Sequence, residues 1–183
     1  MSNGKILVLS GPSGAGKGTV VNRILELDDN VVLSISATTR KKREGEEEGV
    51  HYFYVSKEDF LKKIENNELL EYNCYNENYY GTLKSYVDSL IASGKNVLLE
   101  IDVNGAFQIK EQRPDAVTVF LTAPSIEEIE RRLRKRKTED DDVINRRLEI
   151  AKAEIERASE YDYIVCNEAV DTAAERILEI LNK

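Results

Sequence analysis

A glycine-rich segment near the start of the chain carries the clearest chemical pattern. It reads GPSGAGKGT and lies between an apolar run and an amphipathic stretch. Glycines allow backbone angles that turn consecutive amides inward around an anion, and a following helix adds its positive dipole end. Lys17 would place a mobile positive charge on the outer phosphates of a nucleoside triphosphate. We therefore predict a phosphate-binding loop, or P-loop, composed of Gly11, Pro12, Ser13, Gly14, Ala15, Gly16, Lys17, Gly18 and Thr19.

Candidate metal contacts lie in and beyond this loop. Gly18 occupies the position where a serine or threonine normally reaches Mg²⁺, and the hydroxyl comes one residue later, at Thr19. Glu100 and Asp102 end an apolar run and, two residues apart, should share one face of a strand. We expect at least one of them to face a ligand or a metal, although Asp102 could instead cap a helix. Contacts from Thr19 and Asp102 through water suit Mg²⁺, because this ion keeps several waters.

Strand-like and helix-like patterns alternate along the chain. Short apolar runs predict buried strands at residues 5–10, 31–35, 97–101, 117–121 and 163–166. Apolar residues spaced by three and four predict helices at 16–27, 125–133, 144–158 and 170–181. Ser125 and Glu128 form a capping-box pattern, in which each side chain satisfies a free amide at a helix start. The alternation predicts an α/β fold, with a parallel sheet of the P-loop NTPase type flanked by helices.

Two stretches interrupt this alternation. Residues 36–82 hold most of the tyrosines, around one expected helix, and predict a small β-rich lobe inserted into the sheet domain. The segment RRLRKRKTEDDD, residues 131–142, changes from positive to negative charge and predicts an exposed lid, although a solvated helix end would look the same. We therefore expect a single domain divided into a core of residues 1–35 and 83–183, the inserted lobe at about 36–82 and the lid at about 131–147.

Composition excludes several classes of function. The 26 Lys and Arg against 34 Asp and Glu give a net charge of −8, which argues against a general nucleic-acid binder. No apolar run approaches the ~20 residues that a membrane span requires. Cys74 and Cys166 lie far apart and outside any metal-binding motif, so we expect reduced thiols in a cytoplasmic protein.

Three further motifs follow the loop in order. SISATTRKKREGEEEGVHYF, NNELLEY and NYYGT start at residues 34, 66 and 78, and ExDxxG follows at residue 100. Together with the loop, they resemble the guanylate kinase family, which transfers a phosphoryl group from ATP to GMP. The resemblance is collinear from Gly11 to Asn167 and covers nearly the whole chain.

The resemblance implies a GMP site in the inserted lobe. Guanine offers two adjacent donors, N1–H and the 2-amino group, and the carboxylate of Glu71 would accept from both. Ser36 and Thr82 would donate hydroxyls to guanine O6 and N7, with Asp102 near the base. The residues implied to bind the GMP phosphate are Arg40, Arg43, Tyr52 and Tyr80. Taken singly, these arginines could form a surface patch, and these tyrosines could be packing residues.

The implied mechanism is alignment and charge stabilisation, because a phosphate oxygen of GMP is already anionic and needs no general base. Lys17 and the loop amides would hold ATP phosphates bridged by Mg²⁺. The implied catalytic residues are Lys17, Arg40, Arg132, Arg136 and Arg147. Arg136 and Asn167 would also lie near the adenine of ATP. The lid departs from the Gly-Arg-Gly of the family, since Lys135 and Lys137 flank Arg136.

Two other hypotheses remain open. A related P-loop kinase could use another monophosphate acceptor. Alternatively, an inactive guanylate-kinase-like module could bind phosphorylated peptides through the phosphate arginines. The intact loop with Lys17 favours the enzyme. We expect ATP and GMP as partners, and neither nucleic acid nor a membrane.

Overall fold

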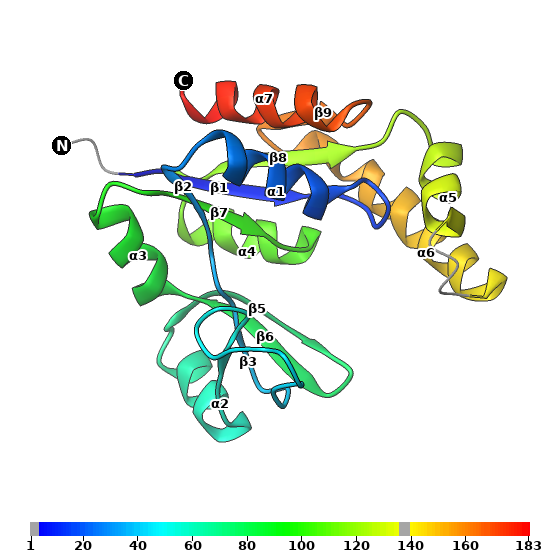
Figure 1. Cartoon of the computed structure of the whole chain (residues 1–183). Helices are drawn as coiled ribbons and strands as arrows, with labels where there is room; N and C mark the ends of the chain where they lie inside the picture. The colour runs from blue at the N-terminus through cyan, green and yellow to red at the C-terminus, as the bar shows by residue number, and fades with distance from the viewer. Residues whose placement is uncertain (1–3, 136–139) are drawn as a thin grey trace.

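Two β-sheets divide the chain in the computed structural model, which describes residues 4–135 and 140–183 (Figure 1). The larger sheet has the strand order β2-β7-β1-β8-β9, and its neighbouring strands pair in parallel. Its strands are β1 (Ile6–Ser10), β2 (Val31–Leu33), β7 (Asn96–Glu100), β8 (Val117–Thr122) and β9 (Tyr163–Cys166). The carboxyl ends of β1 and β7 therefore lie side by side, which is where parallel sheets of this class bind ligands.

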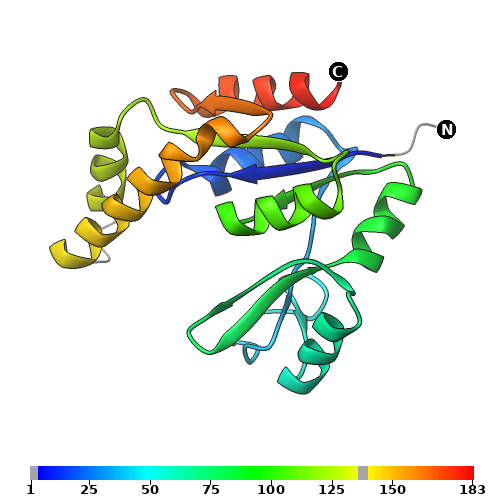
Figure 2. The same ribbon diagram turned by 180° about the vertical axis from the view of Figure 1, so that it is seen from behind.

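Helices cover both faces of this sheet (Figures 1 and 2). They are α1 (Lys17–Leu27), α3 (Lys84–Ala92), α4 (Val103–Gln112), α5 (Ile126–Lys135), α6 (Asp141–Glu156) and α7 (Val170–Leu181), with a short 3₁₀ helix η1 (Ala158–Glu160). Alternate residues of β1 serve two cores: Leu7 and Leu9 pack with α1 and α7, whereas Ile6 and Val8 pack with α3 and α4. Because side chains alternate between the two faces of a strand, β1 contributes to the cores on both sides of the large sheet and lies between the two layers of helices.

The smaller sheet lies between Ala37 and Leu83 and has the order β4-β3-β6-β5. Its strands are β3 (Ala37–Thr38), β4 (Phe53–Tyr54), β5 (Leu69–Tyr75) and β6 (Asn78–Leu83), and α2 (Lys57–Glu65) packs against it. Phe60 of α2 is fully buried against this sheet, together with Ala37 and Leu69. Both views show this unit standing apart from the large sheet, beneath α3 and α4.

The α/β fold class predicted from the sequence is confirmed, with a parallel sheet between helical layers. The capping-box prediction is half right. Ser125 Oγ accepts a hydrogen bond from the Glu128 amide at 3.2 Å, but the Glu128 carboxylate pairs with Arg131 and Arg132. Two guanidinium groups within reach attract this carboxylate more strongly than a single backbone amide does.

The segment expected to form a lid, residues 131–147, includes the end of α5 and the start of α6. Arg136 and Lys137 lie outside the described residues. Within the described part of the chain, no helix combines the length and apolar character that crossing a membrane requires.

Candidate active site

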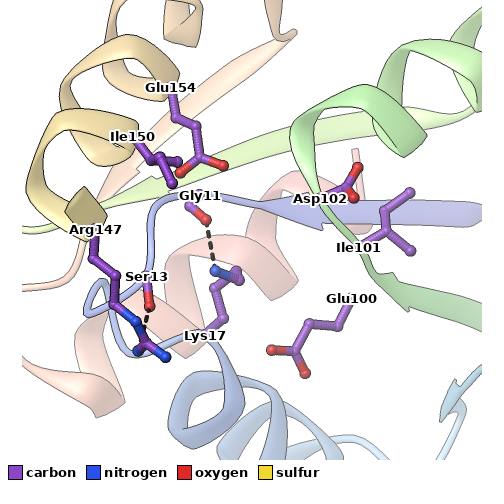
Figure 3. A pocket seen from close by; sticks show the side chains of 9 residues that line it. All are labelled: Gly11, Ser13, Lys17, Glu100, Ile101, Asp102, Arg147, Ile150 and Glu154. Carbon is purple, nitrogen blue, oxygen red and sulfur yellow. Dashed lines mark hydrogen bonds between the residues drawn. The ribbon is translucent and has the colours of Figure 1, made fainter. Parts of the chain in front are cut away.

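The glycine-rich loop connects β1 to α1 at the crevice. Lys17 is the first residue of α1, and its ammonium donates to the Gly11 carbonyl at 2.5 Å (Figure 3). It also donates to the Pro12 carbonyl at 3.3 Å. The loop borders a cavity of about 420 Å³, whose lining includes Ser13, Glu100, Asp102, Arg147 and Glu154. Arg147 of α6 reaches Ser13 Oγ at 3.4 Å. The structure therefore brings Lys17 and Arg147, two of the predicted catalytic residues, to one cavity.

The back of the loop is held by two side chains. Asn167, which is 4% exposed, donates its amide to the Ala15 carbonyl at 2.8 Å. Arg132 donates to the same carbonyl at 3.2 Å and to the Asn167 carbonyl at 3.0 Å. In a trans peptide the C=O and the N–H point in opposite directions. Because the Ala15 carbonyl points toward Asn167, the Gly16 amide of the same peptide points away from Asn167. In this structure Arg132 and Asn167 thus support the loop.

Three carboxylates share the cavity with Lys17. Burial raises the pKa of Glu100 and of Glu154, and in both the nearby Lys17 opposes the shift. The expectation that Glu100 and Asp102 share a strand face is wrong, because β7 ends at Glu100 and Asp102 is the N-cap of α4. Figure 3 shows their carboxylates pointing in different directions. Asp102 Oδ1 accepts from the Gly105 amide at 2.7 Å, so the capping role is real.

A second cavity of about 320 Å³ adjoins the first, because both are lined by Glu100, Ile101 and Asp102. The small sheet contributes its other walls, which are Ser36, Tyr52, Glu71, Asn73, Tyr75, Tyr80 and Gly81. The predicted phosphate loop and most of the predicted GMP residues therefore line two joined cavities between the sheets.

Glu71 is a buried carboxyl group at the second cavity. Its side chain is paired with Thr82, whose hydroxyl donates to Glu71 Oε1 at 2.6 Å. Burial raises the pKa of Glu71 to about 7; the Thr82 hydrogen bond opposes the shift and the Asp102 charge adds to it. Within the described part of the chain, this carboxyl group accepts one hydrogen bond, which suits a ligand that brings further donors.

Arg40 does not line this cavity itself but lies beside Tyr52, which does, and its side chain is held by Glu46. The two groups form a fork, with contacts of 2.7 and 3.1 Å, and the Arg40 guanidinium lies 5.3 Å from the Tyr52 ring centre. Hydrogen bonds from Arg40, from the Arg43 amide and from the Tyr54 hydroxyl lower the pKa of Glu46 to about 2. The Arg43 side chain is exposed. Tyr52 and Tyr80 meet edge to face, with ring centres 6.0 Å apart.

A third cavity of about 590 Å³ lies on the other side of the loop. It is lined by Gly14, Gly16, Thr19, Glu128, Arg131, Arg132, Lys135, Asn167, Glu168 and Val170. Thr19 and Asp102, the two candidate metal contacts, therefore line different cavities. Arg136, expected with Asn167 near the adenine of ATP, lies outside the described residues.

Several residues at the site were missed by sequence reasoning. Glu46 supports Arg40, Glu128 supports Arg132 and Glu154 faces Lys17. Asn73 binds Asp102 from the small sheet at 2.9 Å. Glu46 could have been found, because it belongs to the motif that contains Arg40. Glu128 could also have been found, because it lies four residues before Arg132 on one helix. Glu154 and Asn73 depend on contacts between elements distant in the sequence, and no local pattern marks them.

Comparisons with known proteins agree on one family. A family model described as guanylate kinase matches residues 3–183. Guanylate kinase from Lactococcus lactis is 49% identical over 178 residues, which are 97% of this chain and 87% of the relative. Guanylate kinase from Halalkalibacterium halodurans is 48% identical with the same coverage.

Solved structures extend the likeness to the fold. A crystal structure of guanylate kinase from Anaplasma phagocytophilum is 38% identical and has a TM-score of 0.75, covering 100% of this chain and 86% of that one. Shikimate kinase from Bacteroides thetaiotaomicron, at 13% identity, has a TM-score of 0.51 over 98% of this chain and 99% of that one. The second likeness concerns the fold alone.

Proposed function

Because the chain belongs to the guanylate kinase family, it is an ATP:GMP phosphotransferase, and we propose how its two joined cavities divide the work. GMP occupies the cavity beside the small sheet, and the phosphates of ATP lie on the glycine-rich loop. The γ-phosphoryl group passes between them and yields ADP and GDP. The observation that best supports this arrangement is the buried Glu71 carboxyl group, which is paired with Thr82 and lines the cavity that joins the loop cavity.

The base site uses complementary hydrogen bonding. The Glu71 carboxylate accepts from guanine N1–H and the 2-amino group, and Ser36 donates to O6. Thr82 was expected to donate to the base, but its hydroxyl donates to Glu71 in this structure, so we assign it the role of holding that carboxylate. Adenine has an acceptor at N1 and lacks the 2-amino group, so AMP would leave a buried carboxylate facing a lone pair. Since only the ionised form of Glu71 accepts from both donors, GMP affinity should improve as pH rises through about 7.

The phosphate of GMP binds at the other end of this cavity. Arg40 can fork onto it, and the hydroxyls of Tyr52 and Tyr80 donate to it. Glu46 keeps the Arg40 guanidinium beside the Tyr52 ring, so the cation is already in place when the substrate arrives. Arg43, whose side chain is exposed, adds a second positive charge.

On the ATP side, Lys17 moves from the carbonyls of its own loop to the outer phosphates. Arg147 stabilises the negative charge that develops on the transferred group, and we assign the same role to Arg132 and Arg136. Asn167 lies beside the cavity that receives the adenine. No general base is required, since the attacking oxygen of GMP is anionic.

The residues around the loop also fit Mg²⁺. Among the described residues, no group of three or more His, Cys, Asp or Glu side chains forms a complete metal cage. Mg²⁺ needs none, because it is commonly held by one or two carboxylates, substrate phosphates and waters. Asp102 lines the loop cavity, and Thr19 lies on the other side of the loop, so contacts through water suit both. When bound, the ion neutralises charge on the ATP phosphates.

A coupled assay of ADP formation from ATP tests this proposal, with GMP, AMP, UMP and CMP supplied separately. We expect GMP to be preferred over AMP by roughly four orders of magnitude in kcat/KM, as for sites built on hydrogen bonds to the substrate. Faster use of another monophosphate would identify a kinase with a different acceptor. ADP formation that no monophosphate stimulates would support the inactive phosphopeptide-binding module.

A further inference from the structure

The strand that carries Glu71 lies at an edge of the small sheet and is completed by side chains of another element. In the order β4-β3-β6-β5, one side of β5 is paired with β6, and no strand of residues 4–135 or 140–183 pairs with its other side. Such an edge leaves backbone amides and carbonyls unpaired. Helix α4, which belongs to the large sheet, packs against β5 and supplies Gln108 and Gln112 to this edge.

Gln108 bonds to β5 as a neighbouring strand would. Its Nε2 donates to the Tyr72 carbonyl at 3.1 Å, and its Oε1 accepts from the Tyr72 amide at 3.1 Å. This exchange of both bonds with a single residue resembles a hydrogen-bonded pair in an antiparallel ladder. Gln112 Nε2 donates to the carbonyls of Leu70 at 2.9 Å and Leu69 at 3.3 Å. The two glutamines thus hold the backbone on both sides of Glu71.

The backbone needs this support because β5 is irregular at the same point. The pairing of β5 with β6 shifts register between Leu69 and Glu71. Leu69 packs in the core of the small sheet, Leu70 in the core beneath the large sheet, and Glu71 lines the GMP cavity. A regular strand would place its side chains alternately on two faces. The irregularity lets three consecutive side chains lie in three different environments.

A third amide side chain attaches the next residues of β5 to the start of α4. Asn73 Nδ2 donates to Asp102 Oδ2 at 2.9 Å, while its Oδ1 accepts from the Cys74 amide at 2.7 Å. Asp102 in turn caps α4 through the Gly105 amide. Together, the amides of Gln112, Gln108 and Asn73 connect α4 to β5 before and after Glu71.

We propose that Gln108 is a positioning residue for guanine recognition, which sets the place of the Glu71 carboxylate by pairing with the backbone of Tyr72. The inference rests on the proposed function, in which Glu71 accepts from guanine N1–H and the 2-amino group. Gln108 itself touches no substrate in this scheme. Its replacement should therefore change which base is preferred, rather than the transfer chemistry.

The test compares GMP with IMP, whose base keeps N1–H but lacks the 2-amino group. A well-placed Glu71 gains a second hydrogen bond only with GMP, so we expect the parent protein to prefer GMP by on the order of a hundredfold in kcat/KM. Gln108→Ala and the equally sized Gln108→Glu should each reduce this ratio by about tenfold, because small misplacements at a site are costly. The KM for ATP should change less than twofold.

The ratio of kcat/KM for GMP to kcat/KM for IMP distinguishes a positioning role from a loss of folded protein. A smaller folded fraction lowers both kcat/KM values equally and leaves their ratio unchanged. Glu111→Ala, an exposed substitution on the same helix, is the matched control and should keep the parent ratio. Unchanged GMP/IMP ratios in both Gln108 variants would overturn the inference, whatever happens to the absolute rates. A parent protein that does not phosphorylate GMP, or does not prefer it to IMP, would instead refute the proposed role of the site.

Discussion

At the scale of single residues, burial raises the pKa of the Glu71 carboxyl to about 7, from 4.5 for a free glutamate. Below pH 4.5 the group is protonated in both the folded and the unfolded protein and has no effect. Between pH 4.5 and 7 the folded protein retains a proton that the unfolded chain releases, so the free energy of unfolding falls as pH rises. Above pH 7 the destabilisation amounts to about 3 kcal/mol.

Glu71→Gln should therefore stabilise the unliganded protein at high pH. The amide is uncharged, so the free energy of unfolding of the variant relative to the parent should rise by about 2–3 kcal/mol between pH 4.5 and pH 8. Urea titrations at the two pH values measure it. Glu65→Gln, an exposed change on α2, should show no such trend. A difference between Glu71→Gln and its parent that is the same at both pH values would contradict a raised pKa.

Lys17 is a second residue whose role in catalysis can be tested separately from its role in the fold. Its ammonium contacts the carbonyls of Gly11 and Pro12 in this structure and is proposed to transfer to ATP phosphates. Lys17→Ala should lower kcat by about two orders of magnitude, because it removes charge that stabilises the transition state. Circular dichroism and the melting temperature should stay near those of the parent and of Lys95→Ala, a lysine remote from the cavities. Near-parental turnover by Lys17→Ala would mean that the loop is structural.

At the scale of elements, the shape of the glycine-rich loop depends on the end of β9. Gly16 has a φ of +90°, and a Cβ added there would lie 2.6 Å from the Asn167 amide nitrogen. The same amide holds the Ala15 carbonyl. An alanine at position 16 would therefore strain the backbone and displace the side chain that supports the loop.

Gly16→Ala should weaken ATP binding by at least tenfold, measured by calorimetry. Gly18→Ala is the matched control, because a Cβ placed at Gly18, a residue of α1, meets no described atom within 4 Å apart from its chain neighbours and its own helix backbone. That variant should bind ATP as the parent does and be slightly more stable, since alanine favours a helix. Equal ATP affinity of the two variants would contradict the proposed dependence of the loop on Asn167.

The elements themselves were largely predictable from the sequence, because their signals are local. Short apolar runs predicted β1, β7, β8 and β9 to within a residue or two. The helix expected in residues 36–82 is α2, and Ser56 caps it by accepting from the Asp59 amide. The irregularity in β5 was not predictable, since it results from two cores competing for Leu69 and Leu70.

At the scale of the whole molecule, sequence motifs identified the residues proposed to contact substrate, but not those that hold them in place. Motif positions reflect the chemistry of the ligand and are recognisable one by one. By contrast, Gln108 and Asn73 act through partners 36 and 29 residues away, on surfaces that only the folded chain creates. The packing of α4 against the small sheet brings both residues to the site.

Recognition of guanine by Glu71 is tested most directly by one variant. Purified Glu71→Gln should have a kcat/KM for GMP lowered by roughly two orders of magnitude, because an amide meets guanine's donors with a donor of its own in one of its orientations. Its Kd for ATP should change less than twofold, since the glycine-rich loop lies on the other sheet. If Glu71→Gln phosphorylates GMP as efficiently as the parent protein, Glu71 does not recognise guanine and the account is contradicted.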